Sequence, residues 1–408
     1  MPSANIFCAI ALAASTVMAA SGQTVSVVAT FDGADGQQPN SITQGMDGNF
    51  YGTTSFGGTY GEGTVFAVSP TGTLTSLYSF CAQISANCPD GSVPEGAPLV
   101  QRADGSFYGT TGTGGGSSNA GTIFKITPTG DLTTIYDFAG FPTDGSNPQG
   151  LILASDGSFY GVTYQGGANC ESCGTFFKIT SSGAVTVLYN FCSLQNCSDG
   201  SNPVGVIQAS NGNFYGATAY GGSSMSCGTI FEITPGGQLT TLHNFNQLDG
   251  CHPAGTVIRG RDGGFYGTAG GGAHGAGVAF RMNTAGQFTD FYSFCSRSNC
   301  ADGYIPNAPL LQASDGNFYG TTVFGGSAAR NAGTVFRISR SGQLTTLYSF
   351  CQEKACPEGG KPTGSLIQAN DGNIYGVNSQ GGSGGRAGSG TVFRLTLAPA
   401  ATSHSTQD

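Results

Sequence analysis

The 408-residue chain contains no Trp, and only 9% of its residues are charged. Lys and Arg number 14 against 23 Asp and Glu, and they form no basic run. The resulting net charge of −9 argues against a nucleic-acid backbone or an anionic membrane as the partner. No apolar run is long enough to span a membrane. The 69 Gly residues and the many turn residues also leave little room for long helices.

Phe, Tyr, Val, Ile and Thr are plentiful instead, which favours many short strands. They fall into a pattern in which Asp-Gly-x-Phe-Tyr-Gly, or a close variant, recurs every 51 to 57 residues. A Gly-rich stretch, Gly-Thr-Val-Phe and Leu-Thr-x-Leu-Tyr-x-Phe follow, and Asp-Gly-x-x-Pro lies between repeats. The hexapeptides begin at Asp47, Asp104, Asp156, Asn211, Asp262, Asp315 and Asp371.

Each repeat contains four short strands, a to d, with Gly in the a–b and c–d turns where positive φ is needed. Four strands at this period are typical of a propeller blade, whereas a stacked β-solenoid has shorter coils. The seventh repeat lacks strand d, and the missing strand lies at the start of the chain, in residues 24–31. A ring explains the split, because this strand can complete the last blade and cover its exposed edge.

The sequence therefore predicts an all-β fold, a seven-bladed β-propeller over residues 24–397, closed by residues 24–31. The repeats lie near residues 38–80, 94–138, 148–191, 203–245, 253–294, 306–350 and 362–397. Residues 1–20 contain an apolar run followed by small residues, a pattern typical of a signal peptide. Residues 398–408 form a polar tail that we expect to be disordered, and we expect a secreted monomer.

Twelve of the 13 Cys lie downstream of the expected signal peptide. Short spacings in an exported chain indicate disulfides, and zinc would need ligands that the blades hold apart. Among the less regular cysteines, Cys170–Cys173 with Cys227–Cys251 is favoured, and Cys173–Cys227 with Cys170–Cys251 remains open. Four further pairs each follow a Tyr-x-Phe strand end: Cys81 and Cys88, Cys192 and Cys197, Cys295 and Cys300, and Cys351 and Cys356.

The Asp-Gly-x-Phe-Tyr-Gly-Thr-Thr, Gly-Gly, Gly-Thr-Val-Phe and Leu-Thr-x-Leu-Tyr-x-Phe motifs resemble the tandem repeats of the bacterial choice-of-anchor, GloVer-containing family. The resemblance covers nearly the whole chain after the signal peptide. It implies a bacterial surface or secreted protein, often held by a C-terminal anchor. The polar tail has no apolar span, so free secretion is expected here. The Gly-Gly pairs are also similar to those of kelch propellers, although the kelch Trp is absent.

Chain direction gives the ring two faces, which we call the turn face (a–b and c–d turns) and the loop face (b–c and d–a loops). The loop face carries every Cys after the signal peptide and varies most between repeats, so we expect any binding site there. Aromatic side chains in these loops could stack on sugars or grip a protein, or could simply cover neighbouring blades. The candidates are Phe56, Tyr60, Tyr164, Tyr220, Tyr304 and Phe324.

The Asp-Gly-x-x-Pro series places seven carboxylates in equivalent d–a loops, where they could attract Ca²⁺. We favour the alternative that each shapes its own turn, and we expect no cofactor. The residues are Asp35, Asp90, Asp144, Asp199, Asp249, Asp302 and Glu358.

His252 and His274 are the only candidates for catalysis, because both lie in variable loops of the loop face. With no convincing catalytic group elsewhere, we expect a non-catalytic propeller that binds a glycan or an extracellular protein. The alternatives are a carbohydrate-active lyase or hydrolase with a His and carboxylate site on the same face, and a structural protein of the cell envelope.

Overall fold

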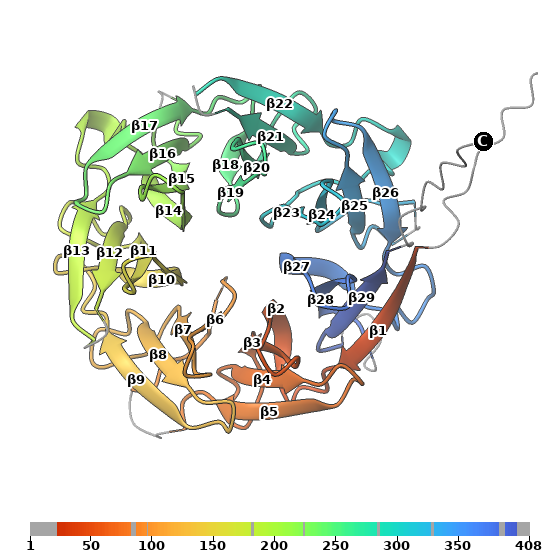
Figure 1. The fold of residues 1–408 in the computed structure, drawn as a ribbon, viewed down its shortest axis with the longest axis horizontal. Helices are drawn as coiled ribbons and strands as arrows, with labels where there is room; N and C mark the ends of the chain where they lie inside the picture. The colour runs from red at the N-terminus through yellow and green to blue at the C-terminus, as the bar shows by residue number, and fades with distance from the viewer. Residues whose placement is uncertain are drawn as a thin grey trace, which may run out of the picture.

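The computed structural model describes residues 23–82, 87–95, 97–180, 183–222, 225–283, 286–327, 330–382 and 388–397. Seven antiparallel sheets stand in a ring, each with its first strand innermost (Figure 1). The arrangement confirms the predicted seven-bladed propeller. The expected signal peptide and polar tail lie outside the described residues. Within them, no helix is long and apolar enough to cross a membrane.

The first four blades use consecutive strands. Blade 1 comprises β2 (Gln37–Gln44), β3 (Phe50–Phe56), β4 (Thr64–Val68) and β5 (Leu74–Ser79). Blade 2 comprises β6 (Val100–Gln101), β7 (Phe107–Thr111), β8 (Thr122–Ile126) and β9 (Leu132–Asp137). Blade 3 comprises β10 (Ser146–Leu153), β11 (Phe159–Gln165), β12 (Thr175–Ile179) and β13 (Val185–Asn190). Blade 4 comprises β14 (Ser201–Gln208), β15 (Phe214–Tyr220), β16 (Thr229–Ile233) and β17 (Leu239–Asn244).

The remaining blades follow the same plan, with blade 5 beginning on two short inner strands. Blade 5 comprises β18 (Cys251–Pro253), β19 (Ile258–Arg259), β20 (Phe265–Gly270), β21 (Val278–Met282) and β22 (Phe288–Ser293). Blade 6 comprises β23 (Leu311–Gln312), β24 (Phe318–Thr322), β25 (Thr334–Ile338) and β26 (Leu344–Ser349). Blade 7 comprises β27 (Gly360–Gln368), β28 (Ile374–Gln380), β29 (Thr391–Thr396) and β1 (Thr24–Thr30).

The ring closes between the two ends of the chain, as predicted. β1 pairs antiparallel with β29, so that Thr24 lies opposite Thr396 and Thr30 opposite Thr391. Phe31 is fully buried, and its ring packs edge-on against Phe66 of blade 1 at 4.9 Å. β1 therefore serves as the fourth strand of blade 7.

The Phe-Tyr pair of each hexapeptide explains how the blades pack without Trp. The Tyr ring of one blade lies against the Phe ring of the next, with ring centroids 4.1 to 4.5 Å apart. In five blades the Tyr hydroxyl also donates to the Asp that opens the hexapeptide, as in Tyr51 to Asp47 at 2.8 Å. The inter-blade pairs are Tyr375–Phe50, Tyr51–Phe107, Tyr108–Phe159, Tyr160–Phe214, Tyr215–Phe265 and Tyr266–Phe318.

The innermost strands of blades 2 and 6 are only two residues long. In blade 6, β23 begins at Leu311, two residues after Pro309. Blade 2 has Pro98 at the equivalent position, and β6 begins at Val100. A Pro cannot donate a backbone hydrogen bond to the sheet, so the second Pro in each of these two loops delays the start of the strand.

Candidate functional site

The carboxylates of the Asp-Gly-x-x-Pro series are bound within their own loops. Asp199 is fully buried and accepts hydrogen bonds from the Tyr189 hydroxyl (2.7 Å) and the Ser193 backbone N–H (2.9 Å). Tyr hydroxyls likewise donate to Asp90, Asp144 and Asp302, at 2.7 to 2.8 Å. Backbone N–H groups donate to Asp35, Asp249 and Glu358. These groups shape their loops, and among the described residues none joins a cluster that could hold a metal ion.

The residue before the Pro of each d–a loop has an unusual backbone conformation. In all seven copies its φ lies between 48° and 56°, and in none of them is it Gly. Its backbone N–H donates to a carbonyl in the b–c loop of the preceding blade, as in Asn202 to Cys173 and His252 to Cys227, both at 2.8 Å. The bond fastens adjacent blades through the backbone, which leaves the side chain free to vary. The seven residues are Gln38, Val93, Asn147, Asn202, His252, Ile305 and Lys361.

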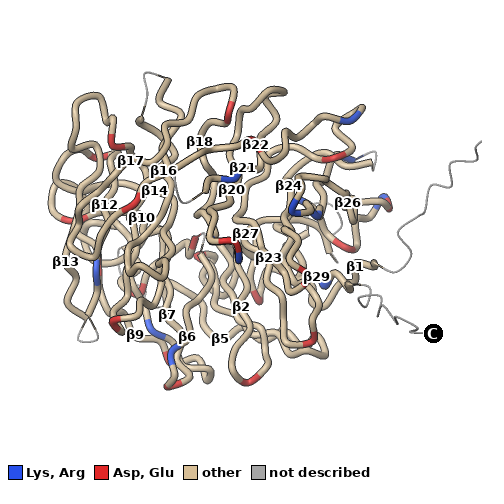
Figure 2. Tube along the Cα trace, turned by 45° about the horizontal axis from the view of Figure 1, so that its top comes forward, with Lys and Arg blue, Asp and Glu red and all other residues tan. Residues whose placement is uncertain are grey.

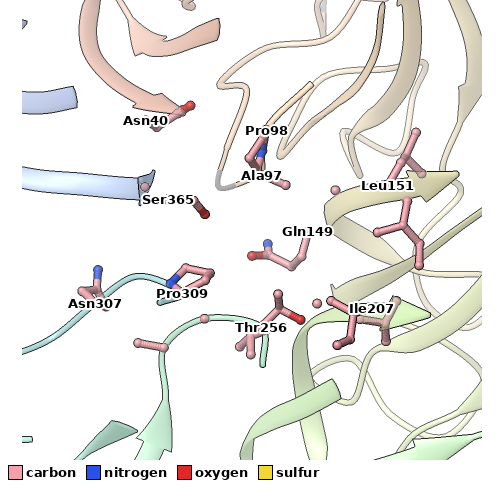
Figure 3. Close-up of a pocket in the computed structure, with 18 of the residues that line it drawn as sticks. Asn40, Ala97, Pro98, Gln149, Leu151, Ile207, Thr256, Asn307, Pro309 and Ser365 are labelled. Carbon is pink, nitrogen blue, oxygen red and sulfur yellow. The ribbon is translucent and has the colours of Figure 1, made fainter. Parts of the chain in front are cut away.

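The ring encloses a central cavity of about 350 Å³. Residues from all seven blades line it, and Figure 3 shows side chains from several blades around the same space. None of the lining residues carries a charge. Amides and hydroxyls alternate with small apolar groups, which suits a neutral ligand rich in hydroxyls. The polar lining residues include Asn40, Gln149, Thr256, Asn307, Thr363 and Ser365.

Glu95 is a carboxyl-bearing residue two positions before Ala97 of the cavity wall, and it is not itself a lining residue. It follows the Pro in its d–a loop, as Asn40 and Gln149 do in theirs. Burial raises the pKa of Glu95 above its usual range, and a hydrogen bond from Asn147 only partly offsets the effect. Asn147 in turn accepts a hydrogen bond from Gln149 Nε2 at 2.5 Å. The three side chains connect a carboxyl that keeps its proton to higher pH with an amide on the cavity wall.

Aromatic groups on the loop face form two clusters. The ring centroids of Tyr220 and His252 lie 4.7 Å apart. His252 is two residues before Ala254 of the cavity wall. Burial raises the pKa of Tyr164, and the nearby Tyr220 hydroxyl adds to the effect, so Tyr164 belongs to the same cluster. Tyr220 is 41% exposed, so its ring can be reached from solvent.

The second cluster spans blades 6 and 7. The Tyr304 and Phe324 rings stack 5.4 Å apart, and the ammonium group of Lys361 lies 5.4 Å from the Phe324 centroid. Asn331 donates to the Tyr304 hydroxyl at 2.7 Å. The other predicted aromatics, Phe56 and Tyr60, are both exposed in blade 1. The structure thus groups four of the six predicted residues into two clusters with different partners.

The two candidate histidines differ in their surroundings. His252 Nδ1 lies 3.0 Å from the carbonyl oxygen of Ala219. Because a carbonyl can only accept, Nδ1 carries a proton in this contact, and Nε2 is the ring nitrogen that can exchange one. His274 is exposed in the loop between β20 and β21. Only His252 is held in a defined orientation.

Exposed large apolar side chains also gather on the loop face. Eight of the 11 such residues lie in its loops or at the strand ends beside them. Charged residues are sparse and scattered around the ring (Figure 2). Most of the exposed large apolar side chains of the described residues therefore lie on the loop face. The eight are Phe56, Tyr60, Phe141, Leu194, Tyr220, Met225, Leu248 and Ile305.

Six disulfides fasten the loop face, and they include all twelve cysteines that were expected to pair. The irregular cysteines form Cys170–Cys173 and Cys227–Cys251, which confirms the favoured of the two open arrangements. This many bridges indicates an oxidising, extracytoplasmic compartment. The four repeated pairs are bridged as predicted: Cys81 to Cys88, Cys192 to Cys197, Cys295 to Cys300, and Cys351 to Cys356.

The repeated bridges differ in how far the ring covers them. Cys351 and Cys356 of the last bridge are both buried in the core between blades 6 and 7. Cys81 and Cys88 of the first bridge are both only half-buried. The reason is packing, since the last bridge lies against β27 and β29, which close the ring.

Sequence reasoning did not identify Glu95 or the cavity-lining residues as a site. The available signal was the position after the Pro, which reads Asn, Glu, Gln, Val, Ala, Asn and Thr around the ring. Because this position varies while the residues around it are uniform, the fold does not require a particular side chain there. The aromatic residues of the larger loops are more conspicuous in the sequence than this single position, and they were predicted as the binding residues instead.

The fold and the repeated loops define a seven-bladed repeat propeller with a central cavity. The Gloeobacter/Verrucomicrobia repeat profile matches residues 15–216 and 202–407. The chain belongs to this family, which confirms the resemblance noted from its motifs. No curated protein matches the chain.

Solved structures with a similar arrangement share little sequence with it. One is a gluconolactonase of Xanthomonas campestris, 12% identical, with a TM-score of 0.46 and coverage of 90% of this chain and 97% of the other. A luciferin-regenerating enzyme is 13% identical, with a TM-score of 0.46 and coverage of 75% and 92%. A puromycin-hydrolyzing peptidase of Mycobacterium tuberculosis is 10% identical, with a TM-score of 0.46 and coverage of 86% and 61%.

These structures contradict the expectation that the chain is a non-catalytic binding propeller. We inferred that role from a uniform frame without an evident catalytic group, yet the similar propellers are enzymes by their titles. The inference was wrong because a propeller can hold reacting groups in its loops and channel without a linear motif. At such low identity the likeness assigns none of these activities to this chain.

Proposed function

We propose that the protein is an extracellular enzyme that acts on a neutral saccharide in the central cavity, with Glu95 as the proton-transfer group. The observation that carries the proposal is the position of Glu95. It is the only carboxylate among the seven residues that follow the loop Pro, and burial raises its pKa. Residues with perturbed pKa values beside a cavity are candidates for acid and base catalysis.

The cavity supports a saccharide as the substrate class. Its amide and hydroxyl groups can bond sugar hydroxyls, while the apolar groups between them can contact the carbon faces of the ring. A charged substrate would find no opposite charge among the lining residues.

The two aromatic clusters support a substrate longer than one sugar. Tyr220 packs against His252, two residues before Ala254 of the cavity wall, and Tyr304 is three residues before Asn307. In this proposal these rings and Phe324 stack on sugar units that extend from the cavity. His252 Nε2 is a second proton-transfer candidate on this face. Residues 1–20 would direct export as a signal peptide.

In the reaction that we propose, Glu95 enters in its protonated form. Its raised pKa lets it hold a proton to higher pH than an ordinary Glu, and it would donate this proton to the oxygen of the scissile bond as that bond breaks. Asn147 would hold the carboxyl group in place, and Gln149 would orient the substrate from the cavity wall. In hydrolysis the carbon side of the broken bond would take a hydroxyl group from water, and the other proton of that water would restore the Glu95 carboxyl group.

The test is a screen for product release from neutral oligosaccharides, polysaccharides and sugar lactones by the purified protein. Glu95→Gln keeps the shape and removes the proton, so we expect kcat to fall by a factor of about 10²–10⁴. Glu353→Gln, an exposed acid in another d–a loop, is the matched control and should keep full activity. Substrates that are retained but never converted, or an unchanged rate in Glu95→Gln, would contradict the proposal.

A further inference from the structure

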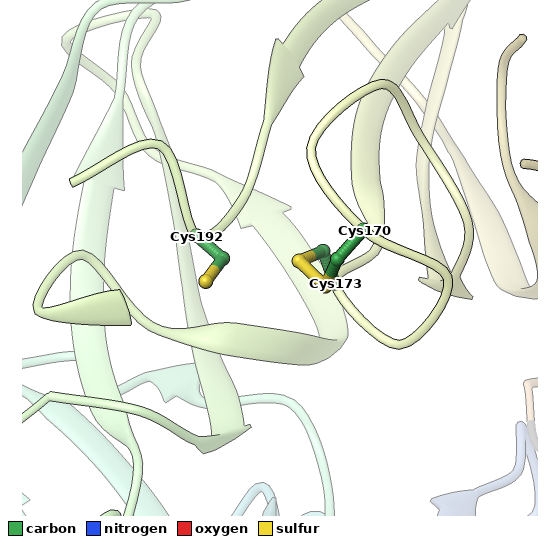
Figure 4. A group of neighbouring side chains, drawn as sticks. All are labelled: Cys170, Cys173 and Cys192. Carbon is green, nitrogen blue, oxygen red and sulfur yellow. A yellow bond between two sulfur atoms is a disulfide. The ribbon is translucent and has the colours of Figure 1, made fainter. Parts of the chain in front are cut away.

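Two disulfides of the loop face lie side by side between blades 3 and 4. Cys170–Cys173 closes part of the loop from β11 to β12, and Cys192–Cys197 closes part of the loop from β13 to β14. The sulfur atoms of Cys170, Cys173 and Cys192 all lie within 4.8 Å of one another (Figure 4). Among the described residues this is the only such cluster of ligand-type side chains.

Hydrogen bonds next to the cysteines fix this approach. Asn169, just before Cys170, donates from Nδ2 to the carbonyl oxygens of Asn190 (3.0 Å) and Phe191 (2.9 Å), and Phe191 immediately precedes Cys192. The Asn190 side chain accepts from the Ala168 backbone N–H at 2.8 Å. The two loops are therefore joined at the residues that flank the sulfur atoms.

We propose that these four cysteines form a thiol–disulfide exchange site whose substrate is a dithiol. The sequence Cys170-Glu-Ser-Cys173 has the two-residue spacing of redox-active pairs, and three of the four residues from 169 to 172 are exposed. Cys173 is fully buried beneath this segment. An external thiol can reach the loop, while the inner sulfur faces the second bridge.

The exchange proceeds in two balanced steps. A thiolate of the dithiol attacks one sulfur of Cys170–Cys173, and its second thiol displaces the protein, which leaves two protein thiols and one oxidised dithiol. A thiolate from Cys170 or Cys173 then attacks Cys192. A new bond to Cys192 forms, the Cys192–Cys197 bond breaks, and the electron pair leaves on Cys197, which takes a proton from water.

The chain contains a matched control for this site. Cys295–Cys300 has the same five-residue separation and follows strand d of blade 5 in the same way. A short 3₁₀-helix lies inside each bridge, η1 (Gln195–Cys197) and η2 (Ser298–Cys300), and a buried Asp holds each loop. The loop from β20 to β21, which corresponds to the Cys170–Cys173 loop, contains no Cys.

The experiment compares Cys197→Ser with Cys300→Ser by alkylating free thiols and mapping disulfides without reduction. In Cys197→Ser the thiolate of Cys192 should attack the neighbouring bridge, so most of the label should move to Cys170 or Cys173. In Cys300→Ser the label should stay on Cys295. Label that remains on Cys192 while Cys170–Cys173 stays intact would overturn the proposal.

A second measurement uses the unaltered protein, in case Cys197→Ser does not fold. One molar equivalent of a phosphine reductant, followed by rapid alkylation, should give molecules with a bridge from Cys192 to Cys170 or Cys173. Cys295 should be found only with Cys300. Native pairings alone in the partly reduced protein would also overturn the proposal.

Discussion

The two faces of the ring use the same kinds of residue for different purposes. On the turn face, Asp104 and Lys125 form an ion pair of 3.1 Å in which both side chains remain partly exposed. On the loop face, Asp199 is fully buried and bonds to a Tyr hydroxyl and to backbone N–H groups. The turn face therefore resembles an ordinary solvated surface, whereas the loop face contains the contacts on which the loop shapes depend.

The comparison also shows where variation is tolerated. Backbone hydrogen bonds fasten the blades at the loop face, so the side chains before and after each loop Pro are not needed for closure. A site can be assembled from such positions without disturbing the ring. Substitutions can test this division of roles.

The largest effect on stability is expected from a substitution that weakens the closure of the ring, because both faces depend on that closure. Phe31→Ala should lower the free energy of unfolding by about 3–5 kcal/mol, because it leaves a cavity against Phe66 between blades 7 and 1. Val27→Ala in the same strand, where the side chain is 39% exposed, should cost less than about 1 kcal/mol. Urea unfolding measures both, and equal losses would mean that β1 does not close the ring.

A second test applies the same substitution to both faces. Asp199→Asn should cost about 2–4 kcal/mol, since it leaves buried donors without a charged acceptor. Asp104→Asn should cost at most about 1 kcal/mol, because the ion pair is solvated. Urea unfolding measures the loss of free energy of unfolding in each variant. Equal losses would contradict the contrast between the two faces.

A third test uses the unusual backbone before the loop Pro. Ile305 has a φ of 55° and is β-branched, a combination that is strained. Ile305→Asn should raise the free energy of unfolding by about 1 kcal/mol, because Asn tolerates this conformation. Lys361→Asn should raise the free energy of unfolding by less, because it also removes the contact between the Lys361 ammonium group and the Phe324 ring. An equal or larger increase in Lys361→Asn would mean that this contact adds no stability.

The smallest expected effect concerns pH. His243 stands where other blades have the Tyr that binds the loop Asp, and its Nε2 lies 3.2 Å from Asp249. Burial lowers the pKa of His243 below 6.5 despite this carboxylate. The unfolded chain then binds the proton more readily, so stability that is present above pH 6.5 is lost as the pH falls below it.

Replacing this histidine should remove that pH dependence. Between about pH 7.5 and 5.5 the Tm of the unaltered protein should fall by about 1–2 °C more than that of His243→Tyr. If the Tm changes equally with pH in the two proteins, the protonation of His243 does not affect stability.

The sequence predicted the ring and its closure, because the repeated motifs and the displaced strand d of the seventh repeat can both be read along the chain. It did not predict the positive φ before the loop Pro. Gln38, Val93 and Lys361 share no turn propensity, and the conformation is set by a hydrogen bond to another blade. Glu95 was missed for a related reason, since its carboxyl group is held by Asn147 of the next repeat, which no linear motif records.

The pairing of β1 with β29 also sets an order of events during synthesis. The strand that a ribosome makes first finds its partner in one of the last strands made. Until some 370 residues have followed it, β1 has no sheet to join, and blade 7 exists only as an unfinished edge. If the chain is exported in an extended form, β1 can pair with β29 only on the far side of the membrane. Ring closure then follows the transport of almost the entire polypeptide across the membrane.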